Sequence, residues 1–282
     1  MAENISVKDL LEAGAHFGHQ VSRWNPKMRP YIFSTKGDIH ILDLEQTMTA
    51  LQKACDFITK TTALGSHVLF VGTKKQAAPI IEFEANRSGQ YFINNRWLGG
   101  LLTNFKTIKA SIERLADLEK KAASPEFEKY TKKERLSTQR DINKLNSIFS
   151  GIKTMQRVPG CVFILDSKTE DIAKKEAIRL KIPVVAVVDT NSNPDGVDYV
   201  IPANDDAVRS IQIITKAIAD ACEEGMKRRQ VALAKDASQE KEEKKPAPFA
   251  KEKEMAGEPK PRVYVAERKK KGPDEVTESE KK

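Results

Sequence analysis

Short, uninterrupted apolar runs are the feature that most constrains the fold of this chain. They occupy residues 68–71, 161–165 and 183–188, and stretches with helical periodicity lie between them. A run without polar–apolar alternation is typical of a strand that is buried on both faces of a sheet. Because helices alternate with these strands, the pattern predicts right-handed crossovers. The predicted fold is therefore α/β, a parallel sheet with helices on both faces.

Weaker patterns extend this prediction toward both ends of the chain. Residues 31–33 and 39–42 are β-prone runs joined by a turn, which predicts a small hairpin at a sheet edge. The prolines within residues 23–30 predict an extended loop there rather than a helix. A final helix is expected over residues 205–224.

A different pattern interrupts the alternation after residue 93. Residues 94–105 contain a Gly-Gly step, and two amphipathic helical patterns follow over residues 105–122 and 132–149. A short polar connection joins the two patterns, which predicts an antiparallel helical hairpin. Since the strand pattern resumes at residue 161, the hairpin is expected to be an insertion. Residues 94–105 are then the junction that aims it.

These patterns predict three parts with different charge. The α/β domain comprises residues 1–103 and 150–225, the inserted coiled-coil hairpin residues 104–149, and a charged, disordered tail residues 226–282. The hairpin has 11 Lys and Arg against 7 Asp and Glu, and the tail has 17 against 12. The two parts together carry +9 and the whole chain carries +8, so the remaining residues have a net charge of −1. This distribution suggests a polyanionic partner.

Cysteine usage and hydropathy indicate the cellular environment. Cys55, Cys161 and Cys222 are far apart and lie in helix or strand patterns, so we expect reduced thiols in the core. We find no signal-peptide pattern and no apolar run of the ~18 residues that a membrane span needs. A cytoplasmic chain without a membrane anchor is therefore expected.

The stretch Gly72-Thr73-Lys74-Lys75 follows a predicted strand, as phosphate-binding loops do. It lacks the spacing of a P-loop, and no G-x-G-x-x-G pattern occurs at a strand exit. Lys74 and Lys75 remain candidates for contact with a nucleic-acid phosphate at a helix N-terminus. The chain also lacks a G-x-S-x-G elbow or a Cys–His motif, so no catalytic residue is expected. A small-ligand or nucleotide-binding enzyme of this fold is the competing hypothesis.

Histidine and aspartate residues form a second candidate site. His19 lies in a short turn, and Asp189 and Asp205 follow predicted strands at the edge where α/β sheets bind ligands. Imidazole and carboxylate groups are ligands for a divalent cation such as zinc or magnesium. A histidine loop packed on the sheet, with acidic helix caps beside it, is the structural alternative. The residue pattern leaves both open.

Cations lie beside aromatic residues in several places. Lysine and arginine contact phosphates and aromatic rings stack on unpaired bases, so this combination favours RNA binding. The alternative is packing, with lysine stems covering apolar surface and tryptophans in the core; at the junction, Trp97 is better explained as a wedge. The predicted RNA contacts are Arg23, Trp24, Lys27, Arg29, Lys74, Lys75, Arg96, Trp97, Lys106, Lys109, Lys132 and Lys133.

Longer motifs resemble one protein family. Residues 14–20 (GAHFGHQ), 95–104 (NRWLGGLLTN) and 202–207 (PANDDA) are similar to motifs of the bacterial small-subunit ribosomal protein S2 family. The resemblance covers about residues 5–225 in unbroken order. The Lys/Glu/Pro-rich segment beyond residue 224 departs from many relatives.

This resemblance implies a flavodoxin-like domain with an inserted coiled-coil hairpin. It implies a non-catalytic, structural role in the 30S subunit during translation, in contact with 16S rRNA between head and body. Neighbouring ribosomal proteins are implied partners, including the mRNA-binding protein S1, which the chain would help to dock. No required cofactor, membrane or small-molecule substrate is expected. Some family members resemble zinc binders, which implies a metal role for His19, Asp189 and Asp205.

Overall fold

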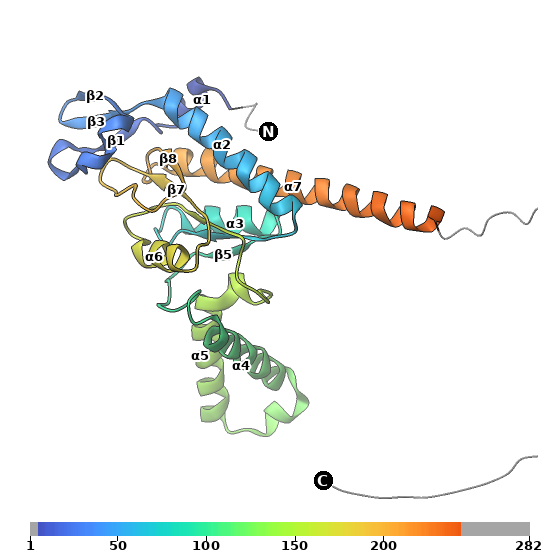
Figure 1. Cartoon of the computed structure of the whole chain (residues 1–282). Coiled ribbons are helices and arrows are strands. Elements are labelled where there is room, and N and C mark those ends of the chain that lie inside the picture. The colour runs from blue at the N-terminus through green and yellow to red at the C-terminus, as the bar shows by residue number, and fades with distance from the viewer. Residues whose placement is uncertain (1–4, 244–282) are drawn as a thin grey trace, which may run out of the picture. The chain divides into compact units, whose positions relative to one another are not determined.

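A five-stranded parallel sheet forms the centre of the chain (Figure 1). The computed structural model describes residues 5–243, with side chains to residue 234. The strand order β5-β4-β6-β7-β8 is that of the flavodoxin-like doubly wound sheet. Every residue of β4, β6 and β7 is buried, which confirms the prediction from the apolar runs. The strands are β4 (Val68–Val71), β5 (Tyr91–Ile93), β6 (Cys161–Ile164), β7 (Val184–Val188) and β8 (Tyr199–Pro202).

Helices cover both faces of this sheet. Alternate strand residues point to opposite sides, so Phe70 and Phe163 enter one apolar core while Leu69 and Val162 enter the other. The first core is closed by α1 (Val7–Glu12), α2 (Leu44–Ala63), α3 (Ala78–Arg87) and α7 (Val208–Glu243). The second is closed by α6 (Asp171–Arg179) and by the base of the inserted hairpin.

The N-terminal region forms a second, antiparallel sheet of order β1-β3-β2. The predicted hairpin is confirmed as β2 (Ile32–Lys36) and β3 (Ile39–Leu42). The sequence predicted this hairpin at the edge of a sheet. In the structure it pairs with β1 (Phe17–Gln20) and belongs to a separate sheet. The short stretch Phe-Gly-His-Gln has no alternation that would have predicted a strand.

The proline-containing loop is also more regular than predicted. Residues expected to be extended form the 3-10 helices η2 (Val21–Arg23) and η3 (Pro26–Tyr31). The Asn25 side chain accepts a hydrogen bond from the backbone N–H of Lys27, which caps η3. Proline at the first helical position fits this cap, because its fixed φ suits a helical turn and its missing N–H would have no partner there.

Two helices form the insertion between β5 and β6, as predicted. They are α4 (Phe105–Ala123) and α5 (Lys132–Phe149), joined through the 3-10 helix η4 (Pro125–Lys129), and η5 (Ser150–Ile152) leads back to the sheet. The predicted apolar stripe is buried where the two helices meet, at Ile108, Ile112, Leu115 and Ile142. The periodic pattern identified these helices because a helix that packs by one face must repeat apolar residues on that face.

The last helix is longer than predicted. We expected it to end at residue 224 and the disordered tail to begin at 226, but α7 continues to Glu243. The segment is rich in Ala, Lys, Arg, Gln and Glu, which favour helix, and the first proline comes later, at Pro246. The rest of the predicted tail lies outside the described residues. Within residues 5–243, no helix has the length and hydropathy needed to cross a membrane.

Candidate functional site

Polar side chains gather at the carboxyl edge of the main sheet. Lys74 follows β4, Asp166 follows β6, Asp189 follows β7 and Asp205 follows β8. All four strands are parallel, so their carboxyl ends meet at one edge. β4 and β6 are neighbours at the point where the strand order reverses, which is where doubly wound sheets bind ligands.

The ammonium group of Lys74 lies at the centre of this cluster. Its Nζ atom is 2.9 Å from Asp166 Oδ2, 2.7 Å from Asp205 Oδ1 and 2.8 Å from Asp206 Oδ1. Burial acts to lower the pKa of Lys74, but these carboxylates outweigh it and raise the pKa above the ordinary value. Lys74 is therefore a permanently charged cation inside an acidic cluster.

Asp205 is the least accessible member of the cluster, with no exposed surface. Burial raises its pKa to about 7, assisted by the neighbouring carboxylates of Asp166 and Asp189 and opposed by Lys74. Among the described residues, its Oδ2 atom has no hydrogen-bond partner. An unpaired, wholly buried carboxylate oxygen is costly, so it marks a position where a cation would be stabilised.

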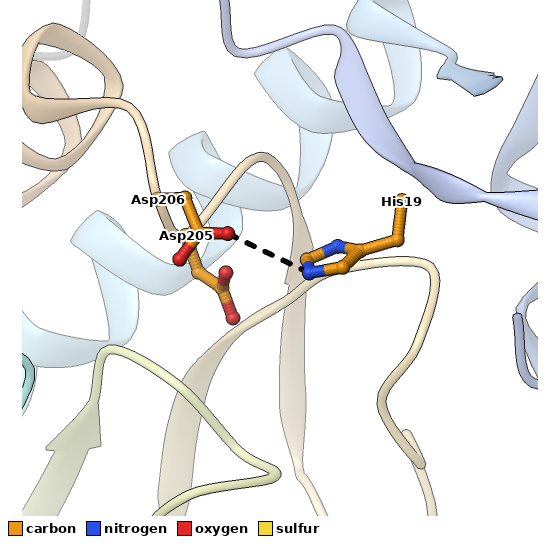
Figure 2. A group of neighbouring side chains, drawn as sticks. All are labelled: His19, Asp205 and Asp206. Carbon is orange, nitrogen blue, oxygen red and sulfur yellow. Dashed lines mark ion pairs between the residues drawn. The ribbon is translucent and has the colours of Figure 1, made fainter. Parts of the chain in front are cut away.

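His19 joins the antiparallel sheet to this cluster (Figure 2). Its Nδ1 atom is 3.0 Å from Asp189 Oδ2 and its Nε2 atom is 3.5 Å from Asp206 Oδ2. The contact with Asp189 raises the pKa of His19, although burial opposes the shift. The backbone N–H of His19 also donates to Thr190 Oγ1 at 2.8 Å. Gly18 makes this approach possible, because a Cβ there would lie 2.6 Å from a Thr190 carbon.

The geometry supports a cation site whose composition differs from the predicted one. His19, Asp205 and Asp206 each offer a ligand atom, and these atoms lie within 4.8 Å of one another. Asp189, predicted as a ligand, lies instead against the other ring nitrogen of His19, as carboxylates that orient metal-bound histidines do. The sequence placed Asp206 among the acidic residues at the strand ends but not in the predicted ligand set, because residue order does not show which carboxylates face His19. One imidazole and two carboxylates suit zinc with a further position open.

Most predicted RNA-contacting cations are solvent-exposed. In the loop before β2, Trp24 is half-buried with its ring 5.1 Å from that of His40, and Lys27 forms an ion pair with Asp195. Lys109 is half-buried on α4. The exposed cations of the predicted set are Arg23, Lys27, Arg29, Lys75, Arg96, Lys106, Lys132 and Lys133.

Two residues of the predicted RNA-binding set are placed differently. Trp97 is only 7% exposed, and its indole nitrogen donates to Glu176 Oε1 at 3.1 Å. Its ring therefore has no face available for a base, and the wedge role agrees with this position. Lys74 is held by three carboxylates, so its charge is already balanced within the protein. Neither residue is available to an RNA partner.

Sequence reasoning also missed an exposed apolar surface near the N-terminus. Phe33 on β2 is 76% exposed and Leu11 at the end of α1 is 51% exposed. Together with His16 and Ile41 they line one open concavity. The stretch containing Phe33 was predicted as a hairpin, but its pattern did not show which face remains in water. Such a surface is typical of a protein-binding site.

Comparison with known proteins identifies the class of this α/β protein: it is a structural protein of the small ribosomal subunit and not an enzyme. The family model described as "Ribosomal protein S2" matches residues 10–225. The chain therefore belongs to the ribosomal protein S2 family. It is 56% identical over 226 residues to "Small ribosomal subunit protein uS2" of Roseiflexus sp. (strain RS-1), covering 80% of this chain and 86% of that protein.

Other relatives bear the same name. The protein of Chloroflexus aurantiacus (strain ATCC 29366 / DSM 635 / J-10-fl) is 53% identical over 228 residues, which is 81% of this chain and 96% of that protein. The protein of Geotalea uraniireducens (strain Rf4) is 51% identical over 233 residues, 83% of this chain and 91% of that protein. The resemblance noted in the sequence motifs is thereby confirmed.

Proposed function

We propose that this protein is bound to 16S rRNA and to neighbouring ribosomal proteins in the 30S subunit of cytoplasmic ribosomes. Membership of the ribosomal protein S2 family is the observation that carries the proposal. Exposed cations in the loop before β2, at the junction and on the hairpin support it, because such groups neutralise phosphates. The proposed contacts are Arg23, Trp24, Lys27, Arg29, Lys75, Arg96, Lys106, Lys109, Lys132 and Lys133.

The hairpin α4–α5 is the proposed arm of this interface, acting as a short coiled coil. Its excess of basic residues supports contact with the RNA backbone. Near its turn, Lys121 lies 4.5 Å from the centre of the Tyr130 ring, and the rings of Phe127 and Tyr130 are 5.9 Å apart. Aromatic rings beside cations suit contact with unstacked bases as well as phosphates.

The exposed apolar surface around Phe33 and Leu11 is the proposed docking site for the mRNA-binding ribosomal protein S1. Large apolar side chains in water favour a protein partner over RNA, since burying them in an interface is stabilising. Phe33 is the natural anchor because it is the most exposed aromatic residue of this surface.

We also propose that His19, Asp205 and Asp206 hold a divalent cation, with zinc favoured by the histidine. The unpaired Oδ2 atom of Asp205 supports this assignment. A bound cation would link the antiparallel sheet to the strand ends and so stabilise the N-terminal region. Asp189 would orient the His19 ring from its second nitrogen.

Sucrose-gradient sedimentation of cell extract tests the ribosomal assignment. We expect the protein to sediment with 30S and 70S particles and to leave them at high salt. Removing residues 104–149 should reduce incorporation if the hairpin anchors the protein. A chain found only in the soluble fractions would contradict the proposed binding to the 30S subunit.

A further inference from the structure

One buried carboxylate binds residues 97–103 of the junction between the main sheet and the hairpin. Glu176, on α6, is only 8% exposed. Its Oε1 accepts from the Trp97 indole N–H at 3.1 Å and the Gly100 backbone N–H at 2.7 Å. Its Oε2 accepts from the Leu102 N–H at 3.0 Å and from both the N–H and the hydroxyl of Thr103 at 3.1 Å. Five donors from one short segment thus converge on one side chain.

The junction is shaped to receive an anion. Gly100 has a φ of +86°, a conformation that residues with a Cβ resist, and the N–H groups of Leu102 and Thr103 beyond it both point to Glu176. Backbone N–H groups that converge in such a turn form an anion-binding concavity. Burial acts to raise the pKa of Glu176, but the bonds from Thr103, Trp97, Gly100 and Leu102 outweigh it and lower the pKa. The carboxylate is therefore charged and supplies the anion.

The bonds to Glu176 lie directly before the first helix of the hairpin. Thr103 is two residues before the start of α4 at Phe105, so the bonds to Glu176 fix the backbone just where the hairpin leaves the α/β domain. Leu101 and Leu102 are also buried in the core between the sheet and the hairpin base. The returning chain is held separately, because Gly151 lies against Phe92 with no room for a Cβ.

We infer that Glu176 is the positioning residue that sets the direction of the hairpin relative to the main sheet. The inference builds on the proposed function in one respect: a fixed direction lets the hairpin and the loop before β2 engage RNA together. Two linked contacts bind far more tightly than either alone only when the geometry allows both at once. Glu176 itself touches no RNA and acts through the junction.

Glutamine is the informative replacement at this position. It matches the size of glutamate but has a single acceptor oxygen, and its NH₂ group donates. In either orientation of the amide, this NH₂ group faces N–H donors of the junction, so at least one pair loses its acceptor. Glu176→Gln should therefore release the junction while the sheet stays folded.

Glu170 provides a matched control. It is a buried glutamate at the other end of α6, where its carboxylate accepts from the N–H and hydroxyl of Thr73. Glu170→Gln changes a buried carboxyl group at the N-cap of the same helix without touching the junction. If buried glutamates near α6 served only to stabilise the fold, Glu170→Gln and Glu176→Gln would change the hairpin direction to the same extent.

Pulsed electron spin resonance on the full chain measures the direction directly. Spin labels at Ser137→Cys on α5 and Lys216→Cys on α7 occupy exposed positions, and the three native cysteines are buried. We expect a narrow distance distribution for the native chain and for Glu170→Gln. For Glu176→Gln we expect a distribution at least about twice as wide. Trp97→Phe removes one of the five donors and should give a distance distribution of intermediate width. This variant replaces Glu176→Gln in the test if Glu176→Gln does not fold.

Incorporation into 30S subunits that lack the protein provides the second measurement. Affinity should fall roughly tenfold or more for Glu176→Gln and stay unchanged for Glu170→Gln. A Glu176→Gln distribution as narrow as that of the native chain overturns the inference, as does equal broadening in both glutamine variants. Failure of the native chain to bind subunits would overturn the proposed function instead, while the distance distributions still decide the role of Glu176.

Discussion

The Nζ atom of Lys74 lies 2.7 Å from Oδ1 of Asp205, a residue with no exposed surface. The pair occupies the edge of the sheet where other doubly wound proteins bind their ligands. Asp166 and Asp206 also contact this ammonium group, so one side chain balances much of the local negative charge. An internal cation at this position agrees with a structural protein rather than with a nucleotide-dependent enzyme.

Replacing Lys74 by methionine should therefore destabilise the fold. The change keeps the apolar stem but leaves Asp166 and Asp205 buried without their counter-ion, which costs about 3 kcal/mol. Urea unfolding at neutral pH measures the loss. Lys75→Met is the control, since Lys75 is exposed, and should change stability by less than about 0.5 kcal/mol. Equal stability of the two variants would contradict the role assigned to Lys74.

The contribution of Glu176 to stability should depend on pH. Its pKa in the folded chain is below the usual 4.5, so the folded state favours the charged carboxylate. This contribution is present above about pH 4.5 and is lost as the pH falls through the folded pKa. The difference in unfolding free energy between the native chain and Glu176→Gln should thus be largest near neutral pH. Urea unfolding at several pH values tests this; a constant difference down to about pH 3 would refute it.

Zinc should raise the melting temperature of the metal-stripped protein. A cation bound only to the folded state at about 100 times its Kd adds roughly 2.7 kcal/mol. Thermal unfolding with and without zinc measures this shift, and His19→Asn or Asp206→Asn should abolish it. Asp56→Asn, which changes an exposed aspartate on α2, should keep the full shift. Unaltered stabilisation in the His19 variant would place any zinc elsewhere.

Lysines near the turn of the hairpin should contribute to the salt dependence of RNA binding. Each phosphate contact that is lost lowers the slope of log affinity against log salt by about 1. Lys132→Gln/Lys133→Gln should thus reduce the slope by about 2 in filter-binding titrations with 16S rRNA. Lys53→Gln, at an exposed position on α2 outside the proposed interface, should leave the slope as it is.

Phe33→Ser should weaken docking of ribosomal protein S1 without altering the fold. Removing an exposed aromatic anchor should lower affinity about tenfold, measured by co-sedimentation of S1 with reconstituted 30S subunits. Phe83, which is 66% exposed on α3, supplies the control variant Phe83→Ser. If Phe33→Ser and Phe83→Ser bound S1 with equal affinity, the surface around Phe33 would not be the S1 docking site.

Local patterns in the sequence accounted for most of the secondary structure. The apolar runs identified the buried strands because a strand covered on both faces needs apolar residues at consecutive positions. The stripe from Phe105 to Ala122 identified α4 because its packed face repeats with the helical period. β1 and the continuation of α7 escaped prediction. Strand β1 forms only because it pairs with β3, which local sequence does not show. The end of α7 has a composition that is common to charged helices and disordered segments, so the sequence did not distinguish between them.

The sequence by itself thus determined the α/β class, the inserted hairpin and the family, since all three are encoded in neighbouring residues. Only the tertiary structure decided which polar groups meet. Trp97 and Glu176 are 79 positions apart, and Lys74 and Asp205 are 131 apart. Parallel strands bring such distant positions to one edge, so partners follow from strand order and register. That arrangement assigned Trp97 to the core and grouped Asp206 with His19 and Asp205.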